Sequence, residues 1–246
     1  MAHPRRRTLC SARELPTLRV GLHVVLADGY AVLPRRLIPD LVDDEGHFGN
    51  RMFIDGVRFF ALPTVRRQLE AEIRAQYEAF ARTGLVLDHV NAHKHFHLHP
   101  SLLEMIVRIG REFAVPAVRV PREPLWFSMR GAGPVAGSAA AVFLAPWLAV
   151  MTRRLRAAGI VCNDHVFGIA ASGSMDEGRL LEILGRLPPG VTEIYLHPAS
   201  ETEQSITASM SDYRHSDELA ALLSPRVRAS IAAAGIACGG YRDLAG

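Results

Sequence analysis

Residues 85–100, Leu-Val-Leu-Asp-His-Val-Asn-Ala-His-Lys-His-Phe-His-Leu-His-Pro, decide how this chain is organised. The apolar start predicts a strand, and Pro100 suits the first turn of a helix that runs to about Phe113. Every histidine of the stretch occupies an odd position, so an extended backbone would direct all of these side chains to one face. They are His89, His93, His95, His97 and His99. Because imidazole readily binds divalent transition metals, the spacing predicts a metal site, with a solvated loop or buried core histidines as the alternatives.

Short apolar strands and longer helices alternate along the rest of the chain. Residues 18–26 predict a strand with His23 on the face opposite its leucines and valines, and residues 27–63 predict a long irregular loop. A helix is expected from an N-cap at Thr64 to Gly84. Further strands are predicted at 117–120, 160–161, 166–167 and 192–196, and further helices at 141–158, 175–187, 217–223 and 226–234. The alternation predicts an α/β fold, and the length suits a single parallel β/α barrel over residues 1–246, with 1–12 as an atypical tail.

Composition excludes several classes of protein. The 28 basic and 25 acidic residues give a net charge of +3, which is too balanced to indicate nucleic-acid binding. The 3 cysteines are widely spaced and form no Cys-x-x-Cys pair, so neither a disulfide framework nor a thiolate zinc site is indicated. The N-terminal residues lack the apolar core of a secretory signal. We therefore expect a cytoplasmic protein.

One uncharged segment complicates this picture. Residues 131–150 carry no charged side chain, but Pro134, Pro146 and many alanines make the segment only weakly hydrophobic. The favoured interpretation is a buried helix with a loop. An element that contacts lipid at the membrane surface is the second interpretation, and a transmembrane span is the third.

Polar side chains lie where the predicted strands end. His23 interrupts one strand, the histidine run follows another, and Arg119 and Arg122 flank a third. Each of these residues taken alone would more often be a core histidine or a salt-bridge partner. In a parallel barrel, however, the carboxyl ends of the strands meet at one face. Together with Asn163, Asp164, His165 and His197, which follow later strands, they predict a metal-assisted hydrolase site.

These residues resemble the YdjC/ChbG family of carbohydrate deacetylases. The motifs that carry the resemblance are Gly21-Leu22-His23, the histidine run from Asp88 to Pro100, Arg119-Val-Pro-Arg122 and Leu196-His-Pro198. The likeness is nearest to the hopanoid-biosynthesis branch, HpnK. It implies a barrel related to the polysaccharide deacetylases, one divalent metal ion (Mg or Zn), and hydrolysis of an N-acetyl group on a sugar. In the hopanoid branch that sugar is the N-acetylglucosaminyl headgroup of a lipid, which implies peripheral contact with the inner face of the membrane; a homodimer is left open.

The resemblance also implies roles for single residues. His23 and His93 correspond to metal ligands, and His197 corresponds to a general acid that protonates the departing amine. Arg119 and Arg122 match an arginine pair expected to orient a carboxylate or the substrate. His95 and His97 are expected to line the cleft, and Lys94 and Phe96 to point away from it.

The chain departs from the family at one point. The family begins with a strand carrying Asn-Ala-Asp-Asp-Phe-Gly, whose carboxylates supply a third metal ligand and the general base, and this sequence has no such motif. We therefore expect a barrel that is incomplete at its N-terminus and impaired in catalysis. Asp164 is the best internal substitute, with Asp88 second. The alternatives to a deacetylase are an amidohydrolase or phosphoesterase barrel and an inactive, truncated deacetylase.

Overall fold

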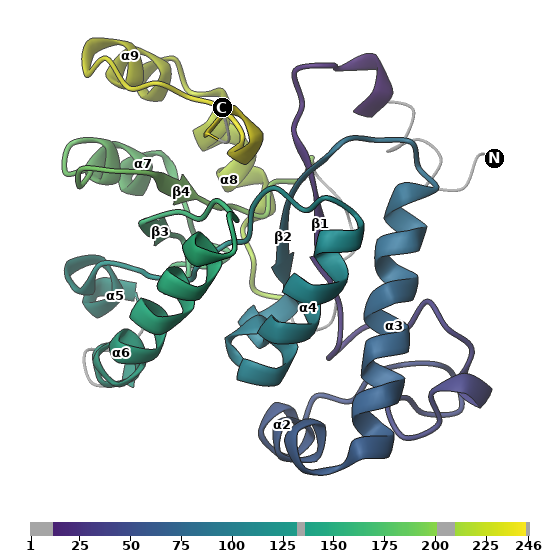
Figure 1. Ribbon diagram of the computed structural model, residues 1–246. Coiled ribbons are helices and arrows are strands. Elements are labelled where there is room, and N and C mark those ends of the chain that lie inside the picture. The colour runs from purple at the N-terminus through teal and green to yellow at the C-terminus, as the bar shows by residue number, and fades with distance from the viewer. Residues whose placement is uncertain (1–11, 132–135, 201–209, 245–246) are drawn as a thin grey trace. The chain divides into compact units, whose positions relative to one another are not determined.

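A computed structural model describes residues 12–131, 136–200 and 210–244 (Figure 1). These residues form two compact units. The first takes in the described residues of Met1–Arg119, Leu155–Val161 and Gly240–Gly246, and the second those of Val120–Arg154 and Cys162–Gly239. Most of the tail predicted at residues 1–12 lies outside the described residues.

Parallel strand segments form the centre of the first unit. Strand β1 (Val20–Val24) pairs in parallel with β2 (Leu87–Ala92), and the register places His23 beside Asn91. Parallel bridges join Val90 to Val118 and Ala117 to Val161, so the pairing extends beyond β2. The three-ten helices of this unit are η1 (Arg35–Leu37), η2 (His93–Leu98) and η4 (Tyr241–Leu244).

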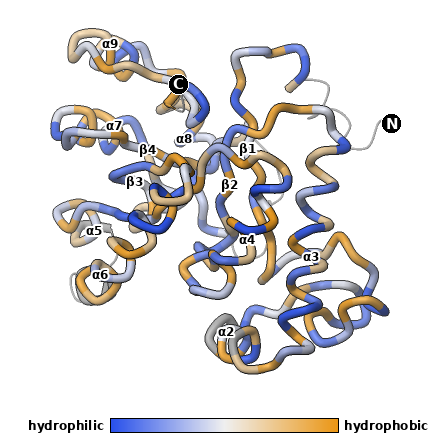
Figure 2. Tube along the Cα trace, viewed as in Figure 1, coloured by the Kyte–Doolittle hydropathy of each residue, from blue (hydrophilic) through white to orange (hydrophobic). Residues whose placement is uncertain are grey.

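Three longer helices belong to this unit: α2 (Met52–Ala61), α3 (Pro63–Ala81) and α4 (Pro100–Glu112). Hydrophilic and hydrophobic residues alternate along α3 (Figure 2), and its apolar side includes Val65, Leu69 and Ile73, which are fully buried. The phenol of Tyr77 donates a hydrogen bond of 3.0 Å to the carbonyl of Ile106, which joins α3 to α4. The apolar side of α3 therefore packs this helix against the rest of the first unit.

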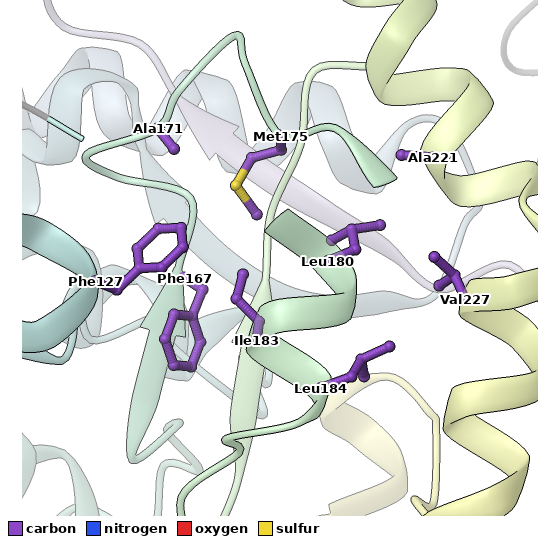
Figure 3. Close-up of a cluster of buried hydrophobic side chains, with 9 residues drawn as sticks. All are labelled: Phe127, Phe167, Ala171, Met175, Leu180, Ile183, Leu184, Ala221 and Val227. Atoms are coloured by element: carbon purple, nitrogen blue, oxygen red, sulfur yellow. The ribbon is translucent and has the colours of Figure 1, made fainter. Parts of the chain in front are cut away.

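The second unit contains two short parallel strands, β3 (His165–Phe167) and β4 (Thr192–Ile194). Its helices are α5 (Leu125–Gly131), α6 (Ala136–Ala157, of which residues up to Arg154 belong here), α7 (Glu177–Leu184), α8 (His215–Leu223) and α9 (Pro225–Ala233). The rings of Phe127 and Phe167 lie 5.3 Å apart, and the side chains of α7 extend this apolar core (Figure 3).

The predicted α/β class with parallel strands is confirmed, whereas several local predictions were wrong. Helix α2 lies inside the segment predicted to be irregular, and α5 was not predicted. Helix α3 begins at Pro63, with Leu62 rather than Thr64 as its N-cap, because proline already has the φ of a first helical residue. Closure of the strands into a single-domain barrel stays a prediction.

The histidine run begins in strand β2 and continues beyond its end, as expected, but it lacks the extended backbone that would place all of its rings on one face. Strand β2 ends at Ala92, and η2 follows with left-handed backbone at Lys94 (φ 50°) and His95 (φ 55°). Phe96, expected to point away, is 6% exposed and packs on Phe59 at a ring distance of 5.3 Å. The turn therefore breaks the alternation of side chains, and the histidines do not share one face.

Candidate metal centre and neighbouring histidines

The structure brings together the rings of His23 and His93. His23 lies on β1, and His93 is the first residue of η2, directly after β2. Since β1 and β2 are parallel neighbours, the end of one strand meets the end of the other. The Nε2 atom of His23 lies 3.3 Å from the Nδ1 atom of His93, with the ring planes 79° apart.

Asn91 fixes the tautomer of His23. The Nδ1 atom of His23 donates a hydrogen bond of 2.5 Å to the amide oxygen of Asn91, which is almost fully buried on β2. Because Nδ1 carries the hydrogen, Nε2 keeps its lone pair, and that lone pair faces His93. Such an outer partner orients a histidine that binds metal. The sequence analysis missed Asn91, although a polar side chain within a buried strand was the available signal.

The spacing of the two ring nitrogens fits two ligands of one ion. Nitrogens bound at about 2.1 Å would be roughly 3.0 to 3.4 Å apart for ligand angles between a right angle and the tetrahedral angle. The observed separation of 3.3 Å lies within that interval. Within the part of the chain that the structure describes, no group of three or more His, Cys, Asp or Glu side chains is arranged to hold a metal ion. The described residues therefore supply an imidazole pair.

A strained loop carries His93. Lys94 pairs with the carboxylate of Asp28 at 2.9 Å, and both residues have positive φ, as does His95. Left-handed backbone is costly for residues other than glycine, and it persists where surrounding contacts enforce it. Burial is the main cause that lowers the pKa of His93, and the charge of Lys94 adds to it, while Asp28 opposes both. A lowered pKa keeps the ring neutral, which is the form that binds a metal.

His97 is a buried residue that supports the backbone. Its side chain is fully buried, and Nε2 donates a hydrogen bond of 3.0 Å to the backbone carbonyl of Arg119. Burial, followed by the charge of His95, lowers the pKa of His97 to about 3. The ring therefore supports the backbone at Arg119 as a neutral donor. His95 is half-buried at a ring distance of 6.2 Å from His97, and its contact with substrate stays a prediction.

His197 follows β4 in the second unit, as the sequence predicts. A buried carboxylate holds its backbone: Glu218 on α8 accepts hydrogen bonds from the backbone amides of His197 and, at 3.0 Å, of Met175. The Nδ1 atom of His215 donates to the carbonyl oxygen of His197 at 2.5 Å. The His197 ring lies 5.1 Å from that of Tyr213. Glu218 was missed because nothing in the local sequence distinguishes it from a surface helix glutamate.

Two of the remaining candidate residues, Arg122 and Asp164, form hydrogen bonds within the second unit, and Arg119 of the first unit is buried. Arg119 is 7% exposed, and Arg122 donates a hydrogen bond of 3.1 Å to the hydroxyl of Thr152. Asp164 accepts from the backbone amide of Val191 at 2.9 Å. Substrate contact by Arg119, Arg122 and Asp164 stays a prediction.

Asp88, the second internal substitute, is an anchor for the chain end. Its carboxylate is buried and accepts hydrogen bonds from the backbone amides of Tyr241 (3.1 Å) and Arg242 (2.9 Å). The ring of His89 also bonds to it, with Nδ1 at 2.9 Å. Both oxygens are therefore occupied by structural contacts.

Comparisons with known proteins identify a family and relatives that match most or part of the chain. A family model described as YdjC-like protein matches residues 5–233. A carbohydrate deacetylase of Geobacillus stearothermophilus is 26% identical over 235 residues, which cover 95% of this chain and 79% of the relative. A carbohydrate deacetylase of Brevibacillus brevis is 39% identical over 110 residues, which cover 45% of this chain and only 41% of that relative.

The fold has a solved counterpart. The crystal structure of an Enterococcus faecalis protein described as a cellobiose-phosphate cleavage protein superposes with a TM-score of 0.68 and 21% sequence identity. The superposition covers 97% of this chain and 82% of the other. At this identity the similarity concerns the fold.

Proposed function

We propose that this chain, which belongs to the YdjC-like protein family, is a metal-dependent carbohydrate deacetylase that hydrolyses the N-acetyl group of an amino sugar. The observation that carries the proposal is the pair of ring nitrogens of His23 and His93, 3.3 Å apart, with the His23 tautomer fixed by Asn91. The carbohydrate deacetylases among its relatives support the choice of reaction.

One divalent ion, zinc or magnesium, is the cofactor that the two rings would hold. Imidazole suits zinc better than magnesium, which prefers oxygen ligands, so we expect zinc to bind more tightly. When bound, such an ion supplies a Lewis acid and lowers the pKa of a bound water. The chain's own contribution is to hold the lone pair of His23 in place through Asn91 and to keep His93 neutral through burial.

We assign to His197 the protonation of the departing amine. This role follows from the family resemblance, and a general acid typically contributes roughly 10²- to 10⁴-fold to the rate. Glu218 and His215 hold the backbone on either side of the ring, so they would keep the acid in one orientation.

The substrate class that we propose is an N-acetylated amino sugar. The N-acetylglucosaminyl headgroup of a hopanoid lipid is the particular form that the resemblance to the HpnK branch favours. Assays with a soluble chito-oligosaccharide and with the glycolipid would distinguish the general class from this form.

The test combines metal removal with substitution. Although the sequence leads us to expect impaired catalysis, the acetate release that remains with an N-acetylglucosamine oligomer should stop after chelation and return with added zinc. His23→Ala and His93→Ala should each lower it to background, while the control His47→Gln, a histidine of the loop between β1 and α2, should leave it unchanged. Acetate release that survives both chelation and the two alanine variants would refute the proposal. Hydrolysis of a sugar phosphate without acetate release would favour the phosphoesterase alternative.

A further inference from the structure

Helix α6 presents an apolar surface to solvent. Phe143 is 85% exposed and Val142 is 59% exposed, which contradicts the expectation that this uncharged segment is buried. Pro146 and Val150 lie on the same side of the helix and are also exposed. The opposite side, with Leu148 and the residues around it, is buried against the protein. The exposed apolar side chains are therefore additional to those that the core requires.

The same exposed side of α6 becomes basic one turn later. Arg153 and Arg154 are exposed and follow the apolar side chains at helical spacing. The helix, Ala136–Ala157, contains no acidic residue at all. Trp147 is half-buried and lies where the apolar and basic parts of the helix meet. The centre of its ring is 5.8 Å from the guanidinium carbon of Arg154. Exposed Phe, an interfacial Trp and neighbouring arginines are residue types found on helices that lie at a membrane surface.

We infer that the exposed side of α6 from Val142 to Arg154 docks on the surface of an anionic lipid bilayer. Phe143 and Val142 enter the boundary between headgroups and acyl chains, and the two arginines bind lipid phosphates in the same plane. A bilayer offers apolar and anionic groups side by side, which matches this helix in both parts. No helix among the described residues is long and apolar enough to cross a membrane, so the contact is with the surface. The inference does not depend on the proposed deacetylase activity.

Cosedimentation of the full chain with lipid vesicles tests the inference. We expect binding to phosphatidylcholine vesicles that contain about one third phosphatidylglycerol, weaker binding at high salt, and little binding to phosphatidylcholine alone. Val142→Ser with Phe143→Ser should weaken binding by at least about tenfold through lost apolar burial. Arg153→Gln with Arg154→Gln should weaken it roughly fivefold per arginine.

Matched controls change equally exposed residues elsewhere. Val86→Ser with Leu223→Ser removes two exposed apolar side chains (63% and 64%), and Arg82→Gln removes an exposed arginine at the C-cap of α3. Both controls should bind vesicles like the unchanged protein. Absence of sedimentation with any vesicle, or equal loss in the controls, would overturn the inference. It would also be overturned if light scattering showed a dimer that the Val142 and Phe143 substitutions dissociate, because the surface would then cover a second copy of the chain.

Discussion

Replacing Asn91 by alanine removes the hydrogen-bond acceptor of the His23 ring without removing either proposed metal ligand. Without that acceptor, the ring of His23 can carry its hydrogen on Nε2, the atom that faces His93 at 3.3 Å. Loss of such an outer partner typically weakens metal binding by roughly 10- to 100-fold, which is about 1.4 to 2.7 kcal/mol. His23 is exposed enough for water to replace the lost acceptor, so the metal-free protein should lose only about 1 kcal/mol of unfolding free energy.

The assay is competition between the protein and a chelating dye for zinc, with urea unfolding of the metal-free protein measured in parallel. Asn163→Ala is the matched control, because Asn163 is also buried and bonds to the backbone of Val120 and His165. That variant should lose more stability, about 2 to 3 kcal/mol, with unchanged zinc affinity. Asn91→Asp should retain zinc binding, because a carboxylate is a stronger acceptor. Equal zinc affinity of the unchanged protein and Asn91→Ala would refute the reasoning.

Three further predictions concern stability. The pKa of His97 is about 3 in the folded chain against 6.5 in the unfolded chain, so the free energy of unfolding should fall by up to about 5 kcal/mol as the pH drops from about 6.5 toward 3. Urea unfolding at several pH values should show a smaller fall over this range for His97→Gln. Glu218→Gln replaces an acceptor of two backbone amides by a group that also donates, and should cost about 2 to 4 kcal/mol in the same assay. Gly173→Ala combines positive φ (77°) with a Cβ too close to the ring of Tyr213 and should lose roughly 2 to 4 kcal/mol in thermal unfolding, whereas Gly46→Ala (φ 79°), with open space around it, should lose only about 1 kcal/mol.

Much of the site could be predicted from the sequence where the signal was local. His23 stood out because it interrupted an apolar strand, and His93 because it followed one. Strands β1 and β2 pair in parallel, so their carboxyl ends lie side by side. This pairing brings the rings of His23 and His93 together. The polar side chain of Asn91 within a buried strand was a signal, but its partner His23, 68 residues away, was not predictable. Glu218 and the ion pair between Asp28 and Lys94 could not be predicted, because their partners are 21 or more residues away in the chain.

The sequence by itself determined the α/β class, since the period of its apolar residues changes between strands and helices whatever the tertiary contacts are. It also determined which residue types meet at the strand ends. Only the tertiary structure decided the shape of the histidine run, because left-handed backbone at Lys94 and His95 depends on the packing of Phe96 and the ion pair with Asp28. It likewise decided that Phe143 is exposed: the part of α6 before Arg153 carries no charge to mark an outer side, and only the packing of the chain selects the side that is covered.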